Sequence, residues 1–361
     1  MGDTTGADHA HMATRHRASR ASALAIAVVA AFATTGACSL ERPARGPTAG
    51  TTDVLPSWAD TPTRQAIVDF VARVTTEGSP DFVPPGERLA TFDNDGTLWV
   101  EHPVYTEVVF AIDRVAQLAA AHPAWRTTPP FADILAGHPE RALAGGKQGI
   151  LELIMATHAG MTPDQFERDV DRWLATARHP RWDRPYTDLV YQPMLELLTY
   201  LRRHGFDVYI VSGGETDFMR AWTRRAYDVA PAHVIGTTAV LRFELQGGVP
   251  VLIREPKLLH VDDGPGKPEA IERIIGARPI LAFGNSDGDL EMLQWTAGGR
   301  GARFMGLVHH TDAAREYAYD RDTEVGRLDQ ALDAAAAADW TVVDMKRDWA
   351  TIFAFERPRE R

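Results

Sequence analysis

The feature that most constrains the fold of this chain is a short apolar run that stops at two acidic residues. Residues 89–92 read Leu-Ala-Thr-Phe, and Asp93, Asp95 and Gly96 follow directly. Such a run is typical of a buried parallel strand, and open α/β sheets bind their ligands at the carboxyl ends of these strands. We therefore expect the side chains of Asp93 and Asp95 to leave the strand end on the same side and to lie close together in a cleft.

Two neighbouring carboxylates repel each other, and this repulsion predicts a cation beside them. The usual solution is a divalent ion held by oxygen ligands, most often Mg²⁺. Such an ion neutralises the negative oxygens of an incoming electrophile, so that a carboxylate can attack as a nucleophile. The acidic pair therefore predicts a magnesium site with Asp93 as the attacking group.

Two later segments carry groups that suit a phosphate. An expected strand at 206–211 ends at Ser212, whose hydroxyl can bind phosphoryl oxygens together with the N–H groups of Gly213 and the residue after it. The alternative for Ser212 is a plain helix N-cap. Lys267 follows a Gly-Pro-Gly turn and starts a helix, where the helix dipole disfavours a cation. We therefore expect Lys267 to have charge partners, namely Asp93 and the phosphoryl group.

These segments together resemble a known superfamily. Residues 93–97, Asp-Asn-Asp-Gly-Thr, resemble the first signature of the haloacid dehalogenase superfamily, in the phosphatase branch with a second Asp two residues after the nucleophile. Residues 208–214 resemble the second signature, Lys267 matches the third, and residues 283–289 resemble the fourth. The resemblance implies a phosphoserine-phosphatase-like or acid phosphatase, with Mg²⁺ as its cofactor and with Thr97 in contact with the phosphate.

The fourth signature departs from the usual pattern of the superfamily, which has an Asp directly after the first Gly. Asn285 stands at that place, and Asp287 and Asp289 follow. An amide oxygen can still bind Mg²⁺, although it contributes no charge. The predicted metal ligands are therefore Asp93 and Asp95 together with Asn285, Asp287 and Asp289, and the choice between the last two acids stays open.

The resemblance covers roughly residues 86–345 and also implies the domain organisation. It predicts an α/β core with a doubly wound, Rossmann-like parallel sheet, interrupted after the nucleophile loop by an all-helical cap. Caps of this kind close over the site and exclude water. The predicted core comprises residues 58–100 and 191–361, and the predicted cap comprises residues 101–190, with helices at 104–120, 149–158 and 162–177.

Three cap residues are candidates for contact with the substrate: Glu101, Tyr105 and Lys147. The alternative for Glu101 is a carboxylate at a helix start, and the alternative for Lys147 is a solvated cation in a loop. A phosphoserine phosphatase would have a serine-recognising Glu at position 102, where this chain has His102. The substrate therefore stays open at this stage.

The start of the chain is typical of an exported protein. Basic residues precede an apolar run at 23–33, and small residues then lead to Cys38, the only cysteine among the 361 residues. This run is shorter than the roughly 20 apolar residues that span a bilayer, so it indicates a signal peptide. Residues 1–38 resemble a lipoprotein signal peptide with lipidation at Cys38; plain secretion and an ordinary buried cysteine are the alternatives.

Residues 39–57 are rich in Pro, Gly, Thr and Ser, and we predict that they form a flexible tether. The true start is Met1 or Met12, and Met12 is favoured because the residues before it add acidic charge that a signal peptide does not favour. The single cysteine excludes a disulfide framework within the chain. With lipidation at Cys38, the chain would touch a membrane only through this lipid anchor.

The net charge of −11 argues against a nucleic-acid partner, because phosphate backbones need a basic surface. The superfamily resemblance, together with the export pattern at the start of the chain, implies a Mg²⁺-dependent phosphomonoester hydrolase that acts on small phosphorylated metabolites outside the cytoplasm. Asp93 would form an aspartyl phosphate, and Asp95 would serve as general acid and then as general base. The alternatives are a phosphoserine phosphatase, a phosphotransferase of the same superfamily and a non-catalytic ligand-binding lipoprotein. The oligomeric state stays open.

Overall fold

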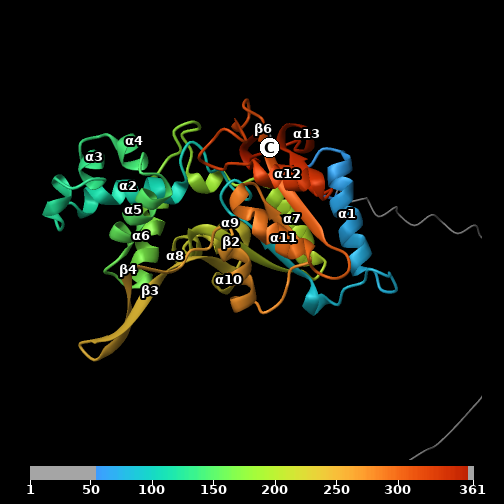
Figure 1. Ribbon diagram of the computed structural model, residues 1–361, viewed down its shortest axis with the longest axis horizontal. Helices are drawn as coiled ribbons and strands as arrows, with labels where there is room; N and C mark the ends of the chain where they lie inside the picture. Colours follow the sequence, from blue (N-terminus) through green and yellow to red (C-terminus); the bar gives the residue numbers. More distant parts are fainter. Residues whose placement is uncertain (1–53, 357–361) are drawn as a thin grey trace, which may run out of the picture. The chain divides into compact units, whose positions relative to one another are not determined.

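The computed structural model describes residues 54–356, which contain one mixed β-sheet with helices packed on it (Figure 1). The strand order is β4-β3-β2-β1-β5-β6-β7, and β8 pairs with β6. The strands are β1 (Leu89–Phe92), β2 (Asp207–Glu215), β3 (Val234–Gln246), β4 (Val249–His260), β5 (Leu281–Gly284), β6 (Phe304–Thr311), β7 (Ala318–Tyr319) and β8 (Thr341–Asp344).

The centre of the sheet is parallel. Strand β1 pairs in parallel with β2 on one side and with β5 on the other, and β6 extends the parallel order beyond β5. Phe92, the last residue of β1, lies opposite Ile210 of β2 and Phe283 of β5. The loops after these three strands therefore leave the same edge of the sheet, as the sequence predicts for a ligand-binding edge.

Helices cover both faces of the sheet, and the side chains of β5 alternate between them. Leu281 and Phe283 belong to the same buried cluster as Ile67 of α1, whereas Ala282 between them belongs to the cluster that contains Ile271 of α10. The predicted doubly wound α/β fold is therefore confirmed. The helices of the core are α1 (Pro62–Thr75), α7 (Gln192–Arg203), α8 (Thr216–Arg220), α9 (Thr223–Tyr227), α10 (Gly266–Ile274), α11 (Leu290–Ala297), α12 (Gln330–Ala337) and α13 (Met345–Asp348).

Between β1 and α7 the chain forms a series of helices, which we call the helical insertion. Its last helix begins at a capping box, in which the side chains of Thr162 and Gln165 each bind the other residue's backbone N–H. Buried residues of α2 and α5, such as Val115 and Leu153, share a separate apolar cluster. The helices are α2 (Thr106–Leu118), α3 (Phe131–Leu135), α4 (Pro139–Leu143), α5 (Gly146–His158) and α6 (Pro163–Thr176).

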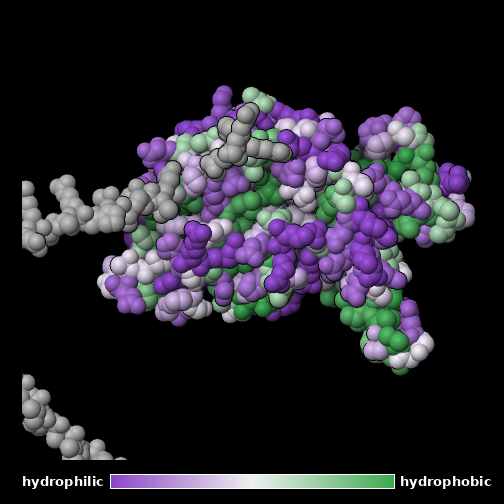
Figure 2. Space-filling model, turned by 180° about the vertical axis from the view of Figure 1, so that it is seen from behind, coloured by the Kyte–Doolittle hydropathy of each residue, from purple (hydrophilic) through white to green (hydrophobic). Residues whose placement is uncertain are grey.

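The hairpin β3–β4 is longer than the sequence indicates. We expected it at 239–253; the two strands run from Val234 to His260 around Gly247 and Gly248, which have φ values of 59° and 86°. The first part of β3 pairs in parallel with β2, and the remainder pairs with β4. Much of the hairpin surface is apolar (Figure 2). Its exposed apolar residues are Leu241, Phe243, Leu245, Val249, Leu252 and Leu259.

The packed part of the chain begins a few residues earlier than the predicted end of the tether. Leu55 and Ser57 are buried, and the backbone N–H of Ser57 donates to Glu196 Oε2 at 2.7 Å. The predicted signal peptide, its Cys38 and residues 39–53 of the predicted tether lie outside the described residues. Within residues 54–356, no helix has both the length and the apolar character needed to cross a membrane.

Candidate active site

Lys267 lies at the centre of the candidate site, in the first turn of α10. Its ammonium donates hydrogen bonds to Asp93 Oδ1 at 2.6 Å, to Asp289 Oδ1 at 2.5 Å and to the carbonyl oxygen of Val211 at 3.0 Å. All three charged side chains are buried, and only 2% of Lys267 is exposed. The α10 turn therefore inserts one positive charge between the acids that follow β1 and β5.

Asp95 lies beside this group, in the loop that follows β1. Trp99 Nε1 donates a hydrogen bond of 2.9 Å to Asp95 Oδ1, which orients the carboxylate. A Cβ atom added to Gly214 would lie 3.5 Å from both Asp95 Oδ2 and Ser212 Oγ. Asp95 and Ser212 therefore border the same small space, which the glycine leaves open.

Ser212 lies inside β2, because the strand continues to Glu215 with a change of register after Ser212. We had expected the strand to end at 211 and a helix to follow. The hydroxyl of Ser212 is buried and accepts the N–H of Gly214 at 3.2 Å, whereas Gly213 is exposed. The loop thus combines one hydroxyl with an exposed backbone segment, the pair of groups predicted to bind phosphate.

Thr97 and Asn285 contact each other behind the acidic pair. Thr97 Oγ1 donates to Asn285 Oδ1 at 2.9 Å, and Asn285 Nδ2 donates to Glu101 Oε1 at 2.8 Å. Glu101 also accepts from the hydroxyl of Tyr319 at 2.7 Å. Thr97 is fully buried, so the structure places it against the amide of Asn285. It also places Glu101 beside that amide, at neither of the two locations considered from the sequence.

The two acids after Asn285 have different surroundings. Asp289 Oδ2 accepts the N–H groups of Asn285 at 2.9 Å and Ser286 at 3.0 Å, while Oδ1 accepts from Lys267. Asp287 Oδ1 instead accepts two N–H groups at the start of α12, each at 2.9 Å. The structure therefore brings Asp289 to Lys267 and Asp93, and it directs Asp287 away from them to α12.

The buried acids at the site outnumber the positive charges. Burial raises the pKa of Asp93 well above its usual range, Asp289 raises it further, and Lys267 opposes this rise. Burial likewise raises the pKa of Asp95 and of Glu101. A divalent cation fits this donor set, because it would balance the excess negative charge and prefers carboxylate and amide oxygens. The residues that could hold it are Asp93, Asp95 and Asn285, with Glu101 as a further acid nearby.

The loop after β1 depends on a close approach at Gly96, whose φ is 76°. A Cβ atom there would lie 2.2 Å from Asn285 Nδ2 and 2.4 Å from Glu101 Oε1. The carbonyl oxygen of Gly96 forms a hydrogen bond with His310 Nε2 at 2.8 Å. His310 therefore supports the loop after β1.

Lys147 lies in the first turn of α5 and forms an ion pair with Asp263. From the sequence we expected Lys147 to lie in a loop. Asp263 in turn lies close to the exposed Gly213, because a Cβ atom on that glycine would be 3.8 Å from the Asp263 side chain. The ion pair therefore joins the helical insertion to the core near the predicted phosphate-binding loop.

A second buried group near this site was not expected from the sequence. It consists of Glu107, His158 and Glu215, which come from α2, α5 and β2. The sequence offers only weak signals: Glu107 lies in the first turn of the first helix after the loop that follows β1, and Glu215 directly follows Ser-Gly-Gly. A hydrogen bond from the N–H of Glu215 to Glu107 Oε2 joins residues 108 positions apart. No local pattern reveals such a pairing.

The profile of the family described as haloacid dehalogenase-like hydrolase matches residues 90–294. No curated protein matches the chain.

Three solved structures illustrate the similarity. A conserved functionally unknown protein from Anaerococcus prevotii is 15% identical, with 69% of this chain and 85% of that chain covered and a TM-score of 0.46. A phosphoserine phosphohydrolase-like protein from Francisella tularensis is 13% identical, with 72% and 95% covered and a TM-score of 0.38. A probable phosphoserine phosphatase from Vibrio cholerae is 17% identical, with 72% and 68% covered and a TM-score of 0.35.

Proposed function

Because the chain belongs to the haloacid dehalogenase-like hydrolase family, we propose that it is a Mg²⁺-dependent phosphomonoester hydrolase with an aspartyl-phosphate intermediate. The observation that carries this proposal is the contact of the buried Lys267 ammonium with Asp93 Oδ1 at 2.6 Å. Asp95 and Ser212 border the open space at Gly214 in the same site. This arrangement places a carboxylate in contact with an ammonium, next to a second acid and a hydroxyl. It suits phosphoryl transfer better than it suits a non-catalytic ligand-binding site.

Asp93 is the nucleophile in this mechanism. The hydrogen bond from Lys267 fixes Oδ1, and the other oxygen of Asp93 attacks phosphorus in line. The new P–O bond forms on Asp93 as the bond from phosphorus to the leaving alcohol oxygen breaks. Ser212 Oγ, the N–H of Gly213 and the ammonium of Lys267 bind the phosphoryl oxygens. Bound Mg²⁺ would supply further positive charge to those oxygens.

Asp95 transfers the protons in both steps. It gives a proton to the leaving alcohol, and it then takes a proton from the water that attacks the aspartyl phosphate. Burial raises the pKa of Asp95, which favours the protonated form needed for the first step. Trp99 Nε1 holds Asp95 Oδ1 so that Oδ2 faces Gly214 and Ser212. Phosphate is released, and Asp93 returns to its carboxylate form.

The substrate class is part of the proposal, and the surroundings of the site support it. We propose small phosphorylated metabolites, with the helical insertion as the cap that closes over them. Glu107 of α2 lies next to Gly214, because a Cβ atom there would be 3.3 Å from Glu107 Oε2. The insertion therefore supplies side chains directly beside the proposed site of the reaction, where a leaving group would be selected.

Phosphate release from a panel of phosphomonoesters, including phosphoserine, sugar phosphates and nucleoside monophosphates, tests the proposal. For at least one substrate, we expect the rate of phosphate release to fall on the order of 100-fold or more when a chelator removes divalent ions. The rate should recover when Mg²⁺ is added, because the ion supplies several kcal/mol of charge stabilisation. Transfer to added alcohols would identify a phosphotransferase instead. Ligand retention without Mg²⁺-dependent phosphate release would contradict the proposal and favour a binding lipoprotein.

We also propose that the protein is exported and anchored through a lipid on Cys38. The support is the basic and apolar pattern before Cys38 in the sequence. In cells that produce the full chain, we expect the unaltered protein in the membrane fraction. The Cys38→Ser variant should lie outside that fraction, because it lacks the residue that would carry the lipid. Equal fractionation of the two proteins would contradict the anchor.

A further inference from the structure

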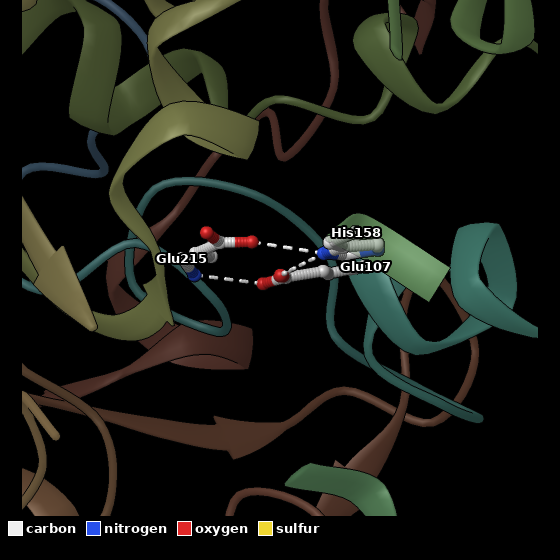
Figure 3. A group of neighbouring side chains, drawn as sticks. All are labelled: Glu107, His158 and Glu215. Atoms are coloured by element: carbon white, nitrogen blue, oxygen red, sulfur yellow. Dashed lines mark hydrogen bonds and ion pairs between the residues drawn. The ribbon is translucent and has the colours of Figure 1, made fainter. Parts of the chain in front are cut away.

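The cluster formed by Glu107, His158 and Glu215 has the geometry of a ligand set. One ligating atom from each residue lies within 4.8 Å of the others. His158 Nδ1 is 2.8 Å from Glu215 Oε2 and 3.7 Å from Glu107 Oε1. Figure 3 shows the imidazole and the two carboxylates pointing toward one another. Three ligands about 2.0–2.1 Å from a tetrahedral ion are separated by roughly 3.3 Å, so these distances need only small adjustments.

Each carboxylate of the cluster has one oxygen that is already held. Glu107 Oε2 accepts the N–H of Glu215 at 2.8 Å, and Glu215 Oε1 accepts from Arg254 Nη2. The other oxygens, Glu107 Oε1 and Glu215 Oε2, face His158 Nδ1. The outer contacts orient the inner oxygens, as outer-shell hydrogen bonds do at metal sites.

Glu107 Oε1 lacks a hydrogen-bond partner within the described part of the chain. Only 5% of Glu107 is exposed, so water does not readily replace the missing partner. A buried, unpaired carboxylate oxygen is costly, and native structures rarely tolerate one. This oxygen points into the cluster and therefore indicates a ligand there.

The neighbouring cations leave the cluster short of positive charge. Arg254 Nη1 binds Asp217, so this guanidinium is shared between two acids, Glu215 and Asp217. Arg114 Nε donates to the carbonyl of Thr157, and Arg114 Nη1 pairs with Asp169 at 2.7 Å. Among the ion pairs of the described residues, Glu107 pairs with His158 and with no arginine or lysine. A bound cation would complete the balance.

We propose that Glu107, His158 and Glu215 form a second metal site, separate from the magnesium site, for a divalent ion of the Zn²⁺ type. One imidazole nitrogen and two carboxylate oxygens are ligands that Zn²⁺ accepts in a four-coordinate site, whereas Mg²⁺ prefers six oxygen ligands. A water molecule would take the fourth position.

The proposed metal site would connect the helical insertion to the sheet, because its ligands come from both. Glu107 and His158 belong to α2 and α5, and Glu215 ends β2 directly after the Ser212 loop. An ion held by all three would fix the position of the insertion over the catalytic site. The proposal does not depend on phosphatase activity, because none of its three ligands carries out a chemical step of that reaction; Glu107 only borders the reaction site near Gly214.

Equilibrium dialysis of the full chain against Zn²⁺, with Mg²⁺ in excess to compete at Asp93, tests the proposal. We expect one Zn²⁺ per chain, retained in Asp93→Asn and weakened by about 100-fold or more in His158→Gln, since even outer-shell changes cost 10- to 100-fold. His138→Gln is the matched control, because His138 is exposed and lies 3.2 Å from a single acid, Glu140. It should bind Zn²⁺ as the unaltered protein does.

Two further measurements keep the test decisive if His158→Gln folds poorly. Glu107→Gln keeps the size of the side chain and changes an oxygen that has no partner, so we expect it to fold and still bind Zn²⁺ at least about tenfold more weakly. Co²⁺ in place of Zn²⁺ should give the intense visible absorption of a four-coordinate ion. Zn²⁺ binding that persists in Glu107→Gln and His158→Gln but disappears in Asp93→Asn would overturn the proposal.

Discussion

Replacement of Asp93 by Asn is expected to reduce phosphate release by a factor on the order of 10⁴ to 10⁶, as the loss of other enzymatic nucleophiles does. An amide does not attack phosphorus, so no aspartyl phosphate can form. The amide oxygen can still accept the hydrogen bond that Lys267 now donates to Oδ1. The fold should therefore survive, and the initial rate of phosphate release with the best substrate of the panel measures the effect.

Asp95→Asn is the informative comparison, because it leaves the nucleophile intact. We expect a phosphorylated protein to form and to break down slowly, since the variant lacks the base that activates water. Rapid-quench detection of the phosphoprotein separates the two steps. Asp207→Asn provides the matched control, because Asp207 is exposed at the start of β2, before Ser212. Undiminished hydrolysis in Asp93→Asn would end the proposed mechanism.

Lys267→Met is expected to lower the free energy of unfolding by about 3–5 kcal/mol, because removal of one partner leaves buried charges uncompensated. The ammonium contacts Asp93 and Asp289, which are 6% and 0% exposed. Hydrolysis should also be lost, since Lys267 binds the phosphoryl group in the proposed mechanism. Urea unfolding without divalent ions measures the stability, so that a bound cation cannot mask the effect.

Two further variants identify the cause of that loss. Lys267→Met combined with Asp289→Asn should recover part of the stability, because one of the stranded charges is removed. Lys257→Met changes an exposed lysine on β4 and should alter the stability by no more than about 0.5 kcal/mol. If Lys267→Met unfolds at the same urea concentration as the unaltered protein, the ion pairs contribute no net stability.

Features that depend on short stretches of chain were predictable. The strand at 89–92 and the acids after it follow from a local apolar run, and the structure has β1 at Leu89–Phe92. The helix that starts near Lys267 follows from a turn and a helical pattern, and α10 begins at Gly266. In both segments, residues close together in the sequence determine the element, so the local sequence pattern is enough to predict it.

Other features depended on partners distant in the sequence. Spacing alone could not separate Asp287 from Asp289, because both follow β5 within a few residues; the start of α12 binds the first, and Lys267 binds the second. Thr97 matched a phosphate contact by resemblance, yet its hydroxyl donates to Asn285. The boundary of the tether moved because Ser57 pairs with Glu196, 139 positions away.

The chain on its own established the parallel α/β architecture, the polar edge of the sheet and the family signatures, because each is written in residues close together. The folded protein alone decided which polar groups meet across elements. The Glu107, His158 and Glu215 cluster exists because α2, α5 and β2 converge, and the contact between β4 and the insertion, with Gly160 donating to the carbonyl of Arg254 at 2.8 Å, arises in the same way. Hydrogen bonds and ion pairs between distant segments depend on distances that packing sets, and no spacing along the chain encodes those distances.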